Sequence, residues 1–197
     1  MWDERYAAPG YLFGTEPARF LVDQAVHLPE RGRVLAVADG EGRNSVFLAA
    51  RGFDVMAFDA SHVAVKKARA LAKGRDVPVR FEVSNVDGWD WAPNAYDAVV
   101  AVFIQFAPPP MRARIFEGIK RTLKPGGMLM LHGYRPEQIT YGTGGPPHAE
   151  NMYTEEMLRE GFGDMRILHL AAYDCEIEEG KGHAGMSALI DLVAVKR

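Results

Sequence analysis

The sequence predicts an α/β fold, a Rossmann-like three-layer sandwich in which helices cover both faces of a mostly parallel sheet. Short apolar segments alternate with helical patterns along the first two thirds of the chain, and this alternation is typical of parallel sheets. The apolar segments contain few polar residues, as expected of strands buried on both faces. The last third breaks the alternation, because two strand-like segments follow each other without a helix between them.

Five apolar segments are predicted to form the parallel part of the sheet. Glycine, proline or charged residues bound each of them, and each has the length of a buried strand rather than of a helix. They are Arg33–Ala38, Phe53–Phe58, Val79–Val83, Tyr96–Phe103 and Met128–His132.

Helical patterns fill the intervals between these strands. The first begins at Glu16–Pro17, where proline suits the first turn, and continues to Leu28. Glycines or capping residues mark the ends of most of the others. These are Asn44–Arg51, a helix that Ser61 caps and Gly74 ends, Met111–Leu123 and Thr154–Gly161.

The two strand-like segments near the C-terminus are predicted to pair as an antiparallel hairpin. Asp164–Ile177 and Ala184–Val195 flank a polar, glycine-containing turn. The sheet is then expected to have seven strands, one of them reversed, and the 197 residues are expected to form a single domain.

Composition excludes several classes of protein. The apolar content is 48%, and the net charge of −3 argues against a nucleic-acid partner. Cys175 is the only cysteine, which excludes a disulfide framework and a cysteine metal site and favours a cytoplasmic setting. No signal peptide and no membrane-spanning run is apparent, and no His, Asp or Glu cluster has metal-ligand spacing, so neither a membrane nor a metal is expected. The sequence indicates no particular oligomeric state.

The segment VADGEGR, which follows the first predicted strand, is the clearest functional signal. Gly40 and Gly42 form a tight turn there, and Asp59 ends the next strand, 19 residues after Gly40. In open parallel sheets, ligands bind beyond the carboxyl ends of the strands, and an acid at this distance is placed to accept hydrogen bonds from ribose hydroxyls. We therefore expect a cofactor of the adenosine type.

Three other kinds of nucleotide-binding protein are weighed against this glycine turn. A P-loop is excluded because no Gly-Lys-Ser/Thr follows. A nicotinamide-dependent oxidoreductase stays an alternative, although Ser45 stands where its fingerprint has a small third residue and the C-terminal hairpin does not suit its sheet. A protein that binds the cofactor without catalysing a reaction is a further alternative that stays open.

Four segments resemble class I methyltransferases that use S-adenosylmethionine (SAM). They are VLAVADGEGR, MAFDAS, VRFEVSNVDGW and LKPGGMLML, and the resemblance that they carry extends over most of the chain. The opening MWDERYAAPGYLFGTEPARFL, together with GEGRN, resembles the branch around tellurite-resistance methyltransferases. The resemblance implies methyl transfer from SAM to a small-molecule acceptor such as a thiol or a chalcogen oxyanion. It also implies that residues 1–30 form an arm and helix over the cofactor.

The resemblance also implies a set of cofactor-binding residues. They belong to the N-terminal arm, the glycine turn, the ends of the second and third strands and the end of the fourth. The set is Tyr11, Phe13, Ala38, Asp39, Gly40, Gly42, Arg43, Asn44, Asp59, Ala60, Ser61, Asn85, Val86, Asp87, Phe103 and Gln105.

The glycine turn departs from the family pattern at three positions. Ala36 replaces the usual acid, and Ala38 replaces the first glycine. Asp39 stands where a cysteine or another small residue is common, and we infer that it takes over contact with the amino group of the methionine part. Asn85 replaces an aspartate that reads the adenine amine, and its carbonyl can still accept that hydrogen bond.

The segment 134–150, which follows the fifth strand, is predicted to be a lid loop and to carry the acceptor site. Its 17 residues have no pattern of their own, and loops of this length are often functional. Tyr134, Arg135, Tyr141 and His148 are the candidates there, with Arg135 suited to an anionic acceptor. His132 ends the strand and is a candidate general base. His183 is expected to be an exposed turn residue without function.

Overall fold

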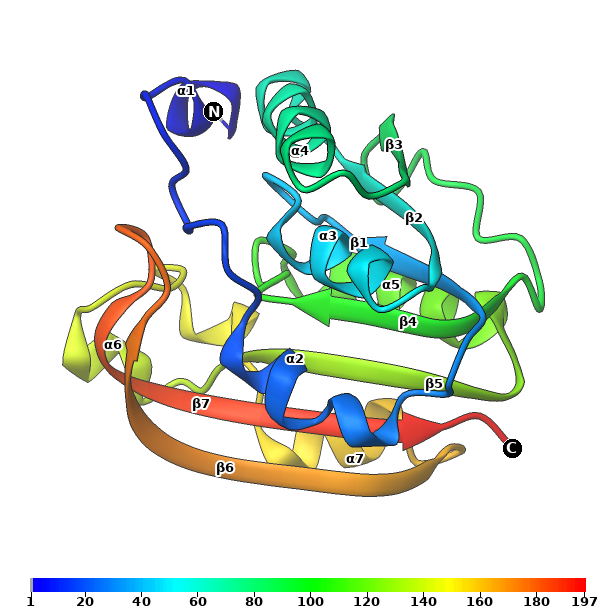
Figure 1. The fold of residues 1–197 in the computed structure, drawn as a ribbon. Helices are drawn as coiled ribbons and strands as arrows, with labels where there is room; N and C mark the ends of the chain where they lie inside the picture. The colour runs from blue at the N-terminus through cyan, green and yellow to red at the C-terminus, as the bar shows by residue number, and fades with distance from the viewer. Residues whose placement is uncertain (1) are drawn as a thin grey trace.

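A seven-stranded sheet forms the centre of the computed structural model, which describes residues 2–197 (Figure 1). The strand order is β3-β2-β1-β4-β5-β7-β6. Strands β1 to β5 run parallel, and β7 is antiparallel to both of its neighbours. This confirms the predicted α/β fold with one reversed strand. The strands are β1 (Arg33–Val37), β2 (Asp54–Asp59), β3 (Val79–Val83), β4 (Tyr96–Val102), β5 (Leu123–Tyr134), β6 (Arg166–Glu178) and β7 (Ala184–Val195).

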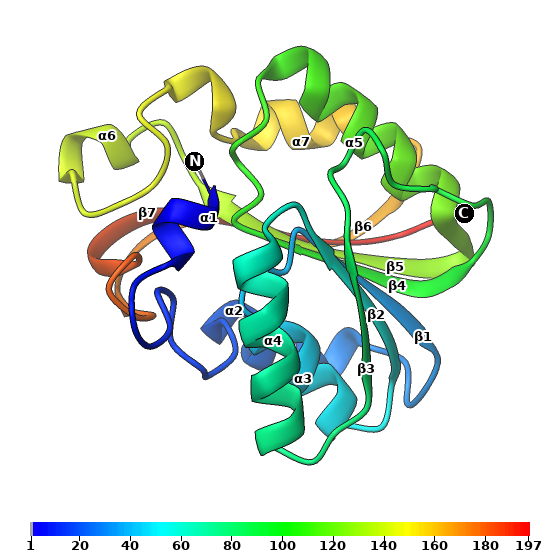
Figure 2. The ribbon, with the colours of Figure 1, turned by 90° about the horizontal axis from the view of Figure 1, so that it is seen from above.

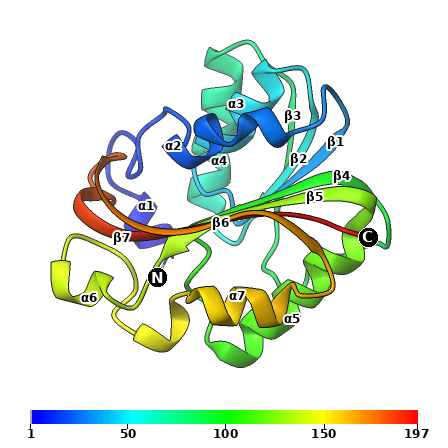
Figure 3. The ribbon, with the colours of Figure 1, turned by 90° about the horizontal axis from the view of Figure 1, so that it is seen from below.

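Helices cover both faces of the sheet, as the apolar strands require. Figures 2 and 3 show α2, α3 and α4 on one face and α5 and α7 on the other, with α1 and α6 at the strand ends. Ser61 Oγ accepts a hydrogen bond from Ala64 N at the start of α4, as predicted for its cap. The helices are α1 (Trp2–Tyr6), α2 (Arg19–Asp23), α3 (Arg43–Ala50), α4 (His62–Gly74), α5 (Pro109–Thr122), α6 (Gln138–Tyr141) and α7 (Glu155–Gly161). Among the helices of residues 2–197, none combines the length and the apolar character that crossing a bilayer requires.

Two predicted elements differ from the structure. The predicted helix Glu16–Leu28 is only the short α2, continued by a 3-10 turn at Ala25–His27. Pro29 forces Leu28 into an extended conformation (ψ 146°), which ends the helical segment. The fifth strand is longer than predicted at both ends, because Leu123 pairs with Tyr96 of β4 and the final residues pair with β7 as far as Tyr134.

The predicted lid loop has structure of its own. Helix α6 and a 3-10 turn at Ala149–Asn151 lie within residues 134–150, so the prediction of an unstructured loop is wrong. Gln138, at the start of α6, is buried, and its Oε1 accepts a hydrogen bond from Ala188 N of β7 (2.8 Å). The segment is thereby tied to the sheet.

Candidate functional site

A cavity of about 760 Å³ lies at the carboxyl ends of the parallel strands. Its wall is formed by the N-terminal arm, the ends of β1, β2 and β4, the segment after β3, the segment after β5 and the tip of the β6–β7 hairpin. Its volume lies within the range typical of small-molecule sites.

Most residues that the sequence predicted as functional line this cavity. They come from every predicted segment, although the predicted roles themselves stay predictions. The lining members of the predicted set are Phe13, Ala38, Asp39, Gly40, Arg43, Asn44, Asp59, Ala60, Asn85, Val86, Asp87, Phe103, Gln105, Tyr134 and His148.

The Asp59 carboxylate organises the glycine turn. Its Oδ2 accepts a hydrogen bond from Gly40 N (2.9 Å), and its Oδ1 accepts one from Ser61 N (2.8 Å). Burial raises the pKa of Asp59, and these backbone hydrogen bonds oppose the rise. Each carboxylate oxygen can accept two hydrogen bonds, so acceptor capacity remains for two ligand hydroxyls.

Asp39 also lines the cavity, and Ser45 engages its carboxylate. Ser45 N donates to Oδ1 (3.3 Å), and Ser45 Oγ donates to Oδ2. Burial raises the pKa of Asp39 to about 7, although the hydrogen bonds from Ser45 lower it. The predicted contact of Asp39 with an amino group would therefore add a partner to a carboxylate that is already hydrogen-bonded.

Two amide side chains of the cavity wall already have partners. Asn85 Oδ1 accepts a hydrogen bond from Gly88 N (2.7 Å), which closes a turn after β3. Gln105 bonds both ends of its amide to the backbone of Tyr134, through Nε2 to the carbonyl (2.7 Å) and through Oε1 to the N–H (2.6 Å). Gln105 thus fixes the end of β5 against the segment after β4.

Three residues predicted to bind the cofactor lie outside the cavity wall. Gly42 instead allows close packing of α3 on α4, since a Cβ there would lie 2.8 Å from the Cβ of Ala68. The Tyr11 hydroxyl donates to the carbonyl of Lys67 on α4 (3.3 Å). Ser61 has the role of a helix cap. These three predictions of direct contact are corrected accordingly.

Arg135 and Tyr141, which were predicted at the acceptor site, also lie outside the cavity wall. Both bond to Asp174 of β6, Arg135 through Nη2 and Tyr141 through its hydroxyl (3.0 Å). Their side chains therefore fasten the segment after β5 to the outer edge of the sheet. The predicted contact of Arg135 with an anionic acceptor is not supported.

His132 is buried and does not line the cavity. Its Nδ1 lies 2.6 Å from Asp191 Oδ1 on β7. Its ring stacks on Phe20 of α2 (centroid distance 5.0 Å), and the ring of Phe103 meets it edge-on (4.7 Å). The prediction that His132 faces the cleft is wrong, because its contacts with Phe20 of α2 and Asp191 of β7 hold the ring outside the cavity wall.

His183 is a cavity residue that sequence reasoning placed elsewhere. The structure buries this side chain to 7% exposure and places it in the wall. Its ring stacks between Phe13 (4.4 Å) and Phe103 (4.1 Å), and its Nδ1 lies 2.6 Å from the hydroxyl of Tyr134. Burial holds the pKa of His183 well below its usual range. The prediction of an exposed turn residue is wrong because the hairpin tip folds over the arm, where Gly182 N donates to the carbonyl of Leu12 (3.1 Å).

Aromatic side chains of the N-terminal arm cover one side of the cavity. Trp2 stacks on Tyr6 (5.8 Å), and Tyr6 meets Phe13 edge-on (6.1 Å). All three line the cavity, and a Cβ on Gly40 would come within 2.9 Å of the Tyr6 hydroxyl. The arm therefore lies beside the glycine turn, and its predicted position over a bound cofactor stays a prediction.

Comparisons with known proteins agree with this geometry. A family model described as a methyltransferase domain matches residues 34–127, a little under half of the chain. The chain is 31% identical to a demethylmenaquinone methyltransferase of Renibacterium salmoninarum over 72% of its length and 54% of the relative. It is 32% identical to a carboxy-S-adenosyl-L-methionine synthase of Aeromonas hydrophila over 64% of its length and 51% of the relative. The chain thus spans about half the length of these curated relatives.

Solved structures show the same fold. A SAM-dependent methyltransferase of Methanosarcina mazei superposes with a TM-score of 0.74 at 19% identity, over 92% of this chain and 98% of the other. TehB of Haemophilus influenzae gives 0.74 at 18% identity, over 100% of this chain and 66% of the other. At such identities the likeness shows the fold alone.

The chain has the fold and the domain signature of a class I SAM-dependent methyltransferase. The family model and the relatives support the predictions that it is an enzyme and that SAM is its cofactor. The cavity also fits such a cofactor, because Asp59 offers free acceptor capacity beside a turn that Gly40 leaves without a side chain.

Proposed function

We propose that this protein transfers a methyl group from SAM to a small-molecule acceptor bound in the same cavity. The observation that carries the proposal is the continuity of the cavity from Asp59, at the end of β2, to His183 at the hairpin tip. When bound, SAM supplies a methyl group on a cationic sulfur, and the protein supplies orientation and the exclusion of water.

Different residues of the cavity wall would contact different parts of the cofactor. Asp59 would accept hydrogen bonds from the ribose hydroxyls, and Val86 and Asn85 would line the adenine end. The aromatic rings of Tyr6 and Phe13 would face the cofactor and shield it from water. A cation close to such rings gains about 0.5–2 kcal/mol.

A small acceptor suits the cavity better than a macromolecule. The N-terminal arm and the hairpin tip meet at the cavity wall, and the net charge of −3 argues against a nucleic-acid partner. A thiol or a chalcogen oxyanion is the finer proposal, supported by the resemblance to the tellurite-resistance branch and by the likeness in fold to TehB. A cytoplasmic location is part of the same proposal.

Calorimetric titration with SAM and with its demethylated product, S-adenosylhomocysteine, tests the cofactor. We expect micromolar binding of both ligands, and no binding at millimolar concentration would refute the proposal. Transfer of label from radioactive SAM to a panel of thiols, chalcogen oxyanions and phenols tests the reaction. Cofactor binding without transfer to any acceptor would favour a non-catalytic SAM-binding protein instead.

A further inference from the structure

Two nitrogen atoms in the cavity wall have no hydrogen-bond partner among residues 2–197. Arg43 is 6% exposed and pairs through Nη2 with Glu179 Oε2 at 2.8 Å, but its buried Nη1 is unpaired. His183 bonds through Nδ1 to the hydroxyl of Tyr134, while its Nε2 contacts no acceptor or donor of the described chain. An unpaired buried polar group such as Arg43 Nη1 is costly, and His183 lines the same cavity, so both nitrogen atoms are candidates for ligand contact.

The Tyr134 hydroxyl determines which nitrogen of His183 carries the proton. Burial raises the pKa of Tyr134, so the hydroxyl keeps its hydrogen. That hydrogen has no acceptor among the described residues other than His183 Nδ1, which must then be the unprotonated nitrogen. The proton of the neutral imidazole is therefore on Nε2, and this atom donates a hydrogen bond rather than accepting a proton.

Arg43 and His183 are held at the same place by the hairpin tip. Glu179, the ion-pair partner of Arg43, donates its backbone N–H to the carbonyl of His183 (2.7 Å). A second contact fixes Glu179, whose Oε1 accepts from Arg19 N (3.0 Å). Stacking between Phe13 and Phe103 restricts rotation of the His183 ring. The two donors are thus positioned before any ligand arrives.

We infer that Arg43 Nη1 and His183 Nε2 form a subsite for an oxyanion, with a carboxylate as the simplest example, on a ligand whose remaining body is apolar. This inference rests on the proposed function and names the chemistry of one end of the same cavity. Both atoms are donors, and oxyanions accept hydrogen bonds without donating any. Phe103, which stacks on His183, and the further wall residues Phe106 and Met111 suit an apolar body.

The sequence predicted that Arg135 binds an anionic acceptor, whereas the inference assigns anion binding to Arg43. Arg135 is occupied by Asp174 outside the cavity, whereas Arg43 keeps one end of its guanidinium unpaired in the wall. Two ligands could supply the oxyanion, namely the methyl acceptor and the amino-acid end of the cofactor. Both have the same carboxylate chemistry, so the experiment must separate them.

Titration of benzoate into two forms of the protein distinguishes these sources. One form is saturated with S-adenosylhomocysteine, which carries a carboxylate, and the other with 5′-methylthioadenosine, which lacks the amino-acid part. Binding of benzoate to both forms assigns the subsite to the acceptor. Binding only to the second form assigns it to the cofactor. In either case benzyl alcohol, the neutral analogue, should bind at least about tenfold more weakly.

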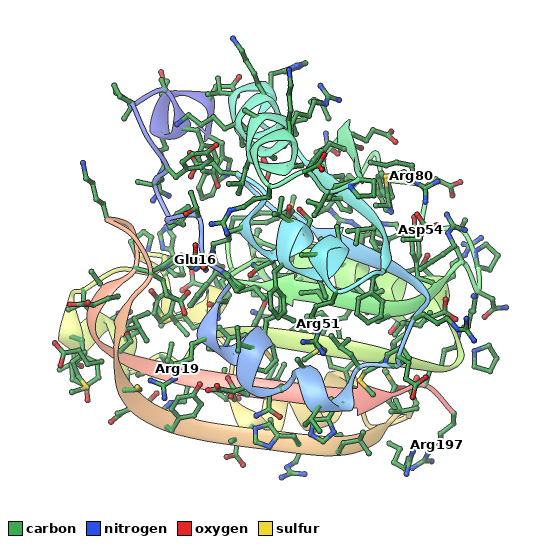
Figure 4. All side chains as sticks on the ribbon, viewed as in Figure 1. Glu16, Arg19, Arg51, Asp54, Arg80 and Arg197 are labelled. Atoms are coloured by element: carbon green, nitrogen blue, oxygen red, sulfur yellow. The ribbon has the colours of Figure 1, made fainter. Side chains whose placement is uncertain are left out.

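Two variants test the named atoms. His183→Leu removes the Nε2–H donor, and Arg43→Lys keeps a cation for Glu179 but loses the second donor of the fork. Each should weaken benzoate binding by about fivefold to tenfold. Matched controls are His62→Leu, at the exposed start of α4, and Arg51→Lys, at the far end of α3 (Figure 4).

Three results would overturn the inference. The first is that benzoate binds to neither ligand-saturated form, and the second is that benzyl alcohol binds as tightly as benzoate. The third is that both variants unfold at the same temperature as their controls and keep the benzoate affinity of the unmodified protein. Failure of the proposed function is a separate result, because neither S-adenosylhomocysteine nor 5′-methylthioadenosine would then bind to the unmodified protein.

Discussion

The carboxylate of Asp59 accepts a hydrogen bond from the backbone N–H of Gly40 at 2.9 Å, although 19 positions separate the two residues. The same carboxylate accepts a second bond from Ser61 N, at the start of α4 (2.8 Å). One side chain thus joins the turn after β1 to the helix after β2, at the wall of the cavity. Its structural role and its predicted ribose contact can be separated by experiment.

Asp59→Asn is expected to weaken S-adenosylhomocysteine binding by tenfold or more, because an amide has one acceptor atom in place of two. The variant should also lose about 1–3 kcal/mol of unfolding free energy, since one buried N–H loses its partner. Calorimetry and urea denaturation measure the two effects. Asp54→Asn, at the opposite end of β2 and paired with Arg80 at 2.8 Å, is the control (Figure 4). Unchanged cofactor affinity in the folded Asp59 variant would exclude the ribose contact.

Gly42→Ala is expected to destabilise the protein more than Gly52→Ala does. Both glycines flank α3 and have φ of 91°, so the strain of a left-handed alanine is common to both variants. A Cβ at Gly42 would lie 2.9 Å from Ala68 Cα, whereas one at Gly52 would meet nothing within 4 Å. The difference in unfolding free energy should be about 1–3 kcal/mol, from overpacking alone. Equal losses in urea denaturation would refute the close helix contact.

Asp39 is expected to make stability fall as pH rises. Its pKa is raised from 3.8 to about 7, because burial outweighs the hydrogen bonds from Ser45. Between these values the unfolded chain releases a proton that the folded protein retains, so wild-type unfolding free energy decreases with pH. Asp39→Asn removes this dependence and should therefore gain stability relative to wild type as pH rises from about 4 to 7. Thermal unfolding of both proteins across this range measures the difference, and a constant difference would contradict the prediction.

The sheet was predictable because its signals are local. Buried strands such as Val79–Val83 have sharp boundaries in the apolar pattern, and Asp59 is recognised by its spacing from Gly40. The short helix α2 was not predictable from periodicity, since the apolar pattern continues to Leu28 whereas the α-helical backbone ends at Gln24 (φ −94°, ψ 1°).

The acceptor end of the cavity was not predictable in the same way. His183 lies beside Glu179 in a polar, glycine-containing turn, a pattern typical of exposed loops. Only the tertiary fold brings this turn onto the arm, where Phe13 stacks on His183. Conversely, Arg135 and Tyr141 belong to the loop that was predicted to carry the acceptor site. Asp174 on β6 binds both side chains and holds them outside the cavity wall. A glycine-rich hairpin tip long enough to reach the strand ends is the one signal that could have pointed to His183.

Lys67 is expected to hold the N-terminal arm over the cavity. Its ammonium donates to the carbonyls of Ala8 (2.8 Å) and Gly10 (2.7 Å), and to Glu41, which accepts a bond from Leu12 N (2.7 Å). Lys67→Met removes all three bonds of the ammonium while keeping most of the apolar stem.

The variant should therefore exchange the amide hydrogens of residues 7–14 faster, as measured by hydrogen–deuterium exchange, and bind S-adenosylhomocysteine several-fold more weakly. Lys66→Met is the matched control, because the neighbouring lysine on α4 is exposed and contacts none of these groups. If both variants exchange and bind alike, the arm is held by its aromatic contacts and its other hydrogen bonds, and not by the Lys67 ammonium. Faster exchange with unchanged affinity would instead mean that the arm closes the cavity without contributing to cofactor binding.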